Sequence, residues 1–112
     1  MLPTHRKPTS PGEILQEEFL NPLEISQSAF VKHLGGTWTQ PKLSAIIGGK
    51  RSITEEIALD FADALGTTAE FWIGLQNDVN LWEASQKRHK IKRIKTRQAT
   101  TVRKRFKPKI KK

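Results

Sequence analysis

The sequence contains no cysteine, so it can form neither a disulfide nor a thiolate metal site. No hydrophobic run approaches the roughly 20 residues that span a bilayer, and the N-terminus lacks the apolar core of a secretory signal. The 112 residues leave room for one small folded domain. These absences predict a soluble, cytoplasmic protein with no membrane partner.

Acidic residues are absent from the last part of the chain. All 11 Asp and Glu residues precede position 87, whereas 14 of the 20 Lys and Arg residues lie in residues 87–112. Residues 1–86 therefore carry a net charge of −5 and residues 87–112 a charge of +14. This division predicts an N-terminal arm (1–9), a folded domain (10–86) and a disordered basic tail (87–112), which has too few apolar residues to fold alone.

Groups that could support catalysis or metal binding are sparse. The three histidines, His5, His33 and His89, show no spacing that suggests a metal site or a pair of nucleophile and base. Gly48 and Gly49 follow a predicted helix, whereas a phosphate-binding glycine loop would precede one. The sequence therefore predicts neither an enzyme nor a cofactor or metal site.

Capping signals and apolar spacing predict helices throughout the folded domain. Ser10 and Glu13 form a capping box with proline at the first helical position, and this helix is expected to end near Asn21. Thr54 and Thr68 cap two later helices with apolar residues at helical spacing. No segment has the alternation of a strand. With the two helices described next, the pattern predicts an all-α bundle of five helices.

Residues 26–51 predict two short helices joined by a glycine-containing turn. Ser26 caps the first helix, and Gly35 and Gly36 end it. Thr39 caps the second helix, and Pro41 lies in its first turn, where a backbone N–H is not needed. This is the outline of a helix-turn-helix, in which the second helix enters the major groove of DNA.

The polar side chains of this stretch suit a DNA surface. Gln40, Lys42 and either Ser44 or Ala45 are expected on the exposed side of the second helix, where amide and ammonium groups can donate to purine N7 and O6. The following basic loop can meet a phosphate strand. The predicted DNA-binding residues are Gln27, Thr39, Gln40, Lys42, Ser44, Lys50 and Arg51. The alternative is an ordinary helical hairpin whose polar residues are merely solvated.

A wider series of motifs resembles a known family. The motifs run in order over about residues 8–84: Pro11-Gly12-Glu13-Ile14-Leu15, Glu17-Glu18-Phe19-Leu20, Pro22-Leu23, Ser26-Gln27, Leu34-Gly35, Leu43-Ser44, Gly49-Lys50-Arg51, Ile53-Thr54, Ala64-Leu65-Gly66-Thr67, Glu70-Phe71-Trp72, Leu75-Gln76 and Leu81-Trp82. This series is similar to the HigA-type antitoxins, also described as virulence-associated protein I homologues, within the XRE family of phage-repressor-like helix-turn-helix proteins. The resemblance implies a homodimer that binds double-stranded operator DNA, represses its own operon and neutralises a HigB-type RNA-cleaving toxin.

Two features depart from the family pattern. The turn from Gly36 to Lys42 is about two residues longer than usual, and it contains Trp38, for which packing is favoured over a contact with DNA. The tail is longer and more basic than the resemblance implies, and its charge favours binding to nucleic-acid phosphates over simple solvation. A stand-alone XRE-type transcription regulator and a nucleoid or RNA-binding accessory protein are the alternative functions.

Phe71, Trp72, Leu75 and Trp82 lie at helical spacing near the end of the folded domain. As core residues they would close the bundle, and as an exposed stripe they would form a dimer contact, for which Trp and Phe are well suited. A dimer would place two second helices about one DNA turn apart, roughly 34 Å, and so read a palindromic site.

Overall fold

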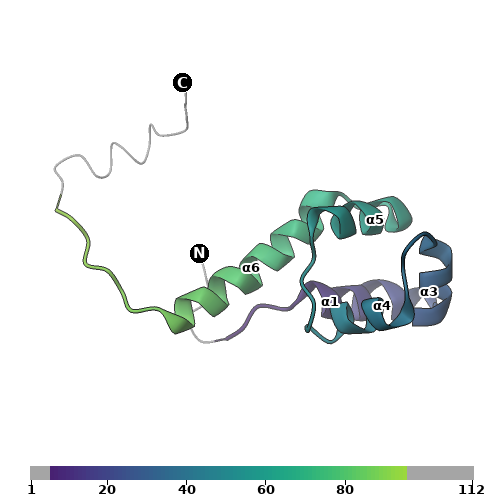
Figure 1. The fold of residues 1–112 in the computed structure, drawn as a ribbon, viewed down its shortest axis with the longest axis horizontal. Helices are drawn as coiled ribbons and strands as arrows, with labels where there is room; N and C mark the ends of the chain where they lie inside the picture. The colour runs from purple at the N-terminus through teal and green to yellow at the C-terminus, as the bar shows by residue number, and fades with distance from the viewer. Residues whose placement is uncertain (1–5, 96–112) are drawn as a thin grey trace, which may run out of the picture.

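The computed structural model describes residues 6–95, and within this range helices are the only regular secondary structure (Figure 1). The elements are α1 (Pro11–Ile14), η1 (Leu15–Leu20), α2 (Asn21–Leu23), α3 (Gln27–Leu34), α4 (Gln40–Ile47), α5 (Glu55–Leu65) and α6 (Ala69–Lys87). Because α1, η1 and α2 are continuous, they form one rod, and the five predicted helices are confirmed. The predicted disorder of the tail falls mainly on residues 96–112, which lie outside the described range.

The helices begin at the residues that the capping pattern predicts. A side-chain oxygen accepts a hydrogen bond from a first-turn backbone N–H at Ser10, Ser26, Thr39, Thr54 and Thr68. The capping box between Ser10 and Glu13 is present in both directions. Local sequence signals therefore determine where each helix starts.

The first rod differs from a regular α-helix in its middle. Residues Leu15–Leu20 form a π-helical turn, with hydrogen bonds from residue i to i+5. In such a turn, residues five apart lie on the same face, so Leu15 and Leu20 both reach the core and are fully buried. The rod ends at Glu24, which adopts the left-handed conformation with φ 58°.

The core lies between two layers, one formed by the first rod, α3 and α4, and the other by α5 and the start of α6 (Figure 1). Phe61 of α5 lies at its centre and contacts the rings of Phe30, Trp38 and Trp72 at centroid distances of 5.9, 5.6 and 5.2 Å. Aromatic pairs at these distances add to the stabilisation from burial. Phe61 therefore links α3, the turn before α4, and α6.

The second half of α6 extends away from this core, and the segment 88–95 continues outward (Figure 1). The side chains of residues 88–95 are exposed. The N-terminal segment runs back along α6, where Lys7 Nζ lies 3.4 Å from Glu83 Oε2. Within residues 6–95, none of the helices has the combined length and hydrophobicity of a membrane span.

Candidate nucleic-acid interface

The two faces of α4 have different environments. Leu43 and Ile46 are buried against the core, whereas Gln40, Pro41 and Ser44 are exposed. Thr39 Oγ1 accepts a hydrogen bond from the backbone N–H of Lys42, which leaves the N–H of Gln40 at the open end of the helix. The exposed face thus offers one amide, one hydroxyl and a helix N-terminus to a ligand in solution.

Lys42 does not lie on the exposed face predicted for it. It is half-buried, and its Nζ lies 4.2 Å from the centroid of the Trp38 ring, a cation–π contact. Of the alternatives Ser44 and Ala45, Ser44 is the exposed residue and Ala45 is half-buried. The expected exposure of Lys42 is wrong, because Trp38 in the long turn folds back beside the first turn of α4.

A chain of polar side chains connects α4 to the first rod. Ser44 Oγ donates to Gln27 Oε1 at 3.1 Å, and Gln27 Nε2 donates to Gln16 Oε1 at 3.1 Å. Gln16 Nε2 in turn donates to Asn21 Oδ1 at 2.6 Å. Gln27 and Ser44, both predicted as DNA contacts, are thus joined and held in place, which fixes the middle of α4 relative to α3.

The loop after α4 carries two exposed cations, Lys50 and Arg51. Their backbone N–H groups donate to the carbonyl oxygen of Ala45 at 2.8 and 3.1 Å, so the loop folds over the end of α4. Gly49, with φ 78°, permits this tight return. The two cations are therefore held close to the C-terminal end of α4.

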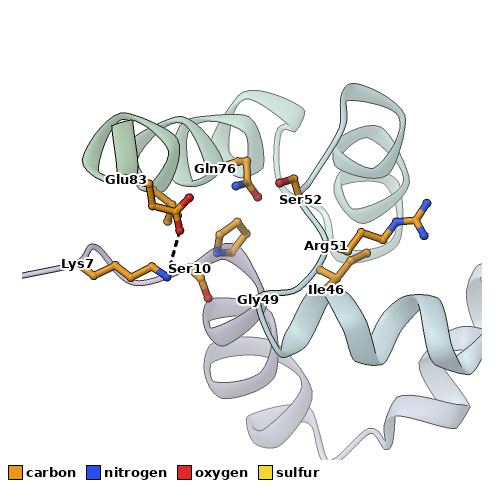
Figure 2. Close-up of a pocket in the computed structure, with 10 residues that line it drawn as sticks. Lys7, Ser10, Ile46, Gly49, Arg51, Ser52, Gln76 and Glu83 are labelled. Carbon is orange, nitrogen blue, oxygen red and sulfur yellow. Dashed lines mark ion pairs between the residues drawn. The ribbon is translucent and has the colours of Figure 1, made fainter. Parts of the chain in front are cut away.

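Gln76 of α6 anchors the far end of this loop, a role that was not predicted for it from the sequence. The backbone N–H of Ile53 donates to Gln76 Oε1 at 2.8 Å, and the Gln76 side chain is buried. Figure 2 shows Gln76 in a small pocket between the loop, the N-terminal segment and α6, while Arg51 points away from it. The available signal was helical spacing: Gln76 lies four residues after Trp72 and three before Val79, on the buried side of α6, where a polar side chain must find partners.

Charge is segregated along the folded domain. Residues 25–54, which contain α3, α4 and the basic loop, have no acidic side chain and four cations. Residues 52–86 have no Lys, Arg or His and seven acidic residues: Glu55, Glu56, Asp60, Asp63, Glu70, Asp78 and Glu83. Within residues 6–95, His and acidic side chains form no group of three suited to a metal ion. The surface around α4 is therefore the part of the domain that suits a polyanion.

Comparison with known proteins shows which family this chain belongs to. No family model matches the sequence. The uncharacterised HTH-type transcriptional regulator YbaQ of Escherichia coli (strain K12) is 41% identical over 80 residues, which cover 70% of this chain and 67% of that protein. Antitoxin HigA-1 of Vibrio cholerae serotype O1 is 39% identical over 83 residues, or 74% of this chain and 76% of the relative. The chain belongs to the HigA-type antitoxins.

A solved HigA structure agrees with this assignment. Pseudomonas aeruginosa antitoxin HigA, solved with the higBA promoter, has a TM-score of 0.67 to this chain and 26% sequence identity. The match covers 93% of this chain and 100% of that one. The HigA resemblance inferred from the sequence motifs is therefore confirmed. The relatives named here are described as antitoxins and transcriptional regulators, and none is described as an enzyme.

The aromatic stripe predicted on α6 is divided by the fold. Trp72 has no exposed surface, and its Nε1 donates to Thr67 Oγ1 at 2.7 Å. Of the two roles predicted for this stripe, Trp72 therefore has the core role, and the dimer contact is wrong for this residue. Phe71 is 41% exposed, while Leu75 and Trp82 are half-buried. These three residues lie on one side of α6, at the edge of the core, where the Phe71 ring contacts that of Trp72 with centroids 5.0 Å apart and Leu75 packs against the core.

Proposed function

We propose that this chain binds operator DNA as a homodimer, represses its own operon and neutralises an RNA-cleaving toxin. The observation that carries the DNA-binding part is the exposed face of α4, where Gln40 and Ser44 stand within an acid-free stretch of the domain. The HigA structure solved with the higBA promoter supports the same use of the fold.

Each predicted DNA-binding residue has a distinct role in this proposal. Gln40 reads base edges in the major groove, since its amide can both donate and accept and its side chain is exposed. Lys50 and Arg51 meet the phosphate strand beside the groove. Thr39 shapes the start of α4, and Gln27 with Ser44 forms the fixed polar face behind Gln40. Lys42, whose ammonium group lies over the Trp38 ring, adds positive charge near the DNA phosphate backbone.

Dimerisation is proposed through Phe71, Leu75 and Trp82 of α6. Phe71 is exposed and Leu75 and Trp82 are partly exposed, and large aromatic side chains are enriched at protein–protein interfaces. In a dimer through this side of α6, two copies of α4 would read both halves of a palindrome.

The charge segregation also supports a contact with a basic toxin. A protein that binds and cleaves RNA needs a positive surface, and residues 52–86 provide seven acidic side chains without a single Lys, Arg or His. The stretch that would meet the toxin therefore differs from the acid-free stretch that would meet DNA. One antitoxin could then use separate surfaces for its two partners.

The test of the antitoxin function is co-expression with the product of the neighbouring gene. We expect that product alone to stop growth, and we expect this chain to restore growth and to co-purify with it. A neighbour that is harmless and does not bind would contradict the antitoxin function. A stand-alone transcription regulator would then be the second candidate, which the similarity to the HTH-type regulator YbaQ favours.

Gln40→Ala and Lys50→Ala are expected to affect DNA binding differently. Gln40→Ala should reduce the preference for the chain's own promoter over scrambled DNA by about tenfold, since a base contact contributes roughly 1–3 kcal/mol of discrimination. Lys50→Ala should weaken binding to both duplexes about equally and lower the salt slope by about 1. Fluorescence anisotropy titrations with both duplexes at several salt concentrations measure these changes.

The matched control is Gln86→Ala, which removes the same side chain from an exposed position on α6, far along the chain from α4. We expect it to leave both affinities unchanged. A promoter preference that survives Gln40→Ala would contradict the role of Gln40 and assign base reading to Ser44 or Lys42.

The basic tail, residues 87–112, is proposed to add affinity for DNA phosphates without regard to sequence. The tail carries 14 cations and no acid, and its described part, 87–95, is exposed. Cations that replace condensed counterions on DNA increase affinity strongly at low salt. The tail would thus hold the protein on DNA while α4 selects the site.

A further inference from the structure

Trp38 lies in the turn between α3 and α4, directly before the N-cap residue of α4. Its side chain is 8% exposed and stacks on Phe61 of α5, with ring centroids 5.6 Å apart and 26° between the ring planes. A buried aromatic pair of this kind restricts the position of both rings. The start of α4 is therefore attached to α5 as well as to α3.

The indole N–H of Trp38 makes a second contact with α5. Nε1 donates to Asp60 Oδ2 at 2.8 Å, and Asp60 is half-buried. A hydrogen bond to a carboxylate is charge-assisted and stronger than one between neutral groups. Stacking alone would let the indole slide across the Phe61 ring, and the hydrogen bond removes that freedom.

Lys42 contacts the same indole from α4. Its Nζ lies 4.2 Å from the ring centroid, and its backbone N–H donates to Thr39 Oγ1 at 3.3 Å. The first turn of α4 therefore holds the ring that α5 also holds. Because the ring touches both helices, its position determines how the N-terminus of α4 lies on the domain.

The preceding glycines explain why the turn needs such an anchor. Gly35 and Gly36 have φ 66° and 57°, and a Cβ atom on either would meet nothing within 4 Å. A side chain at either position would therefore find no neighbour to hold it, so the glycines give the turn no side-chain anchor. Trp38 is the first large side chain after the glycines, and Gln40 follows two residues later, at most about 7 Å along the chain. The position of Trp38 therefore restricts where Gln40 lies.

We propose that Trp38 and Asp60 are positioning residues for DNA recognition, which fix the start of α4 so that Gln40 meets the base edges. This inference rests on the DNA-binding function proposed above. It assigns a role in site selection to a carboxylate on α5, a residue within the acidic part of the domain. Asp60 acts through Trp38 and does not itself meet the DNA.

Three substitutions test the hydrogen bond. Trp38→Phe keeps an aromatic ring on Phe61 but removes the N–H, and Asp60→Ala removes the acceptor. Asp60→Asn keeps an accepting oxygen and removes the same charge as Asp60→Ala. Binding is measured to a duplex of the DNA immediately upstream of the gene and to a scrambled duplex. The affinity ratio is the affinity for the upstream duplex divided by the affinity for the scrambled duplex. We expect Trp38→Phe and Asp60→Ala to lower this ratio about tenfold without changing the affinity for the scrambled duplex. Asp60→Asn should keep most of the original ratio.

Trp72→Phe is the matched control, because it also removes an indole N–H from a hydrogen bond, the one to Thr67 in the core. We expect it to lower stability while keeping the affinity ratio. An unchanged ratio in Trp38→Phe and Asp60→Ala, or an equal loss in Trp72→Phe, would overturn the positioning role.

A measurement without DNA separates this inference from the proposed function. If the unmodified protein itself shows no preference for the upstream duplex, the proposed function fails. Amide hydrogen exchange at Lys42 and Leu43, whose N–H groups bond to Thr39, then still tests the anchor. We expect faster exchange in Trp38→Phe and Asp60→Ala and normal exchange in Asp60→Asn. Exchange that is the same in all variants would overturn the anchor.

Discussion

Gly12→Ala is expected to destabilise the domain by about 3 kcal/mol, at the upper end of the usual cost of overpacking a core. Gly12 is buried in α1, where α1 crosses α4. A Cβ atom there would lie 2.1 Å from the carbonyl oxygen of Ile46 and 2.6 Å from Cα of Ile47. Both are backbone atoms of α4, so no side chain can rotate away and the two helices must separate.

Gly74→Ala is the matched control, since Gly74 also lies inside a helix but a Cβ atom there would meet nothing within 4 Å. We expect this substitution to stabilise the domain by about 0.5–1 kcal/mol, because alanine has less freedom to lose than glycine when the chain folds. Urea denaturation followed by circular dichroism measures both changes. Equal effects of the two substitutions would contradict the close approach of α1 to α4.

Gly12→Ala should also weaken DNA binding in the molecules that remain folded. Ile46 and Ile47 belong to the helix that carries Gln40, so moving their backbone away from Gly12 also shifts the proposed base-reading side chain. A displacement of this kind reduces contacts with base edges more than contacts with phosphates. The promoter preference should therefore fall more than the affinity for scrambled DNA.

Helix starts and ends could be predicted because they depend on neighbouring residues. Ser26, Thr39 and Thr54 each accept a hydrogen bond from a backbone N–H three residues later. Gly66 ends α5 in the left-handed conformation that glycine adopts without strain. A local pattern of three or four residues contains all the information that these contacts need.

Contacts between distant parts of the chain could not be predicted in the same way. The exposure expected for Lys42 was wrong because its position depends on Trp38, whose own place is fixed by Asp60 and Phe61 on a helix about 20 residues later. Gln16, which accepts a hydrogen bond from Gln27, likewise lies in the π-helical turn, and no capping or spacing signal in the sequence marks that turn.

The aromatic stripe of α6 illustrates the same limit. Neighbouring residues on a helix point in directions about 100° apart, so Phe71 and Trp72 must face different surroundings. Helical spacing predicts that both are apolar positions, but it does not say which one faces Phe61. The packing of α5 against α6 decides this, and it buries Trp72 while leaving Phe71 exposed.

Removal of the tail is expected to produce the largest change in DNA affinity. A chain ending at Lys87 keeps all of α6 and loses 13 of the 20 cations. If about six of these contact phosphates, the slope of log affinity against log salt should become shallower by about 5. The affinity lost between 50 and 200 mM salt would then be about a thousandfold smaller for the shortened chain than for the full chain.

This experiment must separate the charge of the tail from its length. A chain of full length in which residues 88–112 carry glutamine at every Lys and Arg position provides the control, and it should behave like the shortened chain. Both should keep the preference for the promoter, because α4 and its anchor in the core are unchanged and residues 88–95 make no buried contact. Equal salt slopes in all three proteins would contradict a role of the tail on DNA. Residues 1–86, with a net charge of −5, would then have to bind DNA through the acid-free surface around α4 alone.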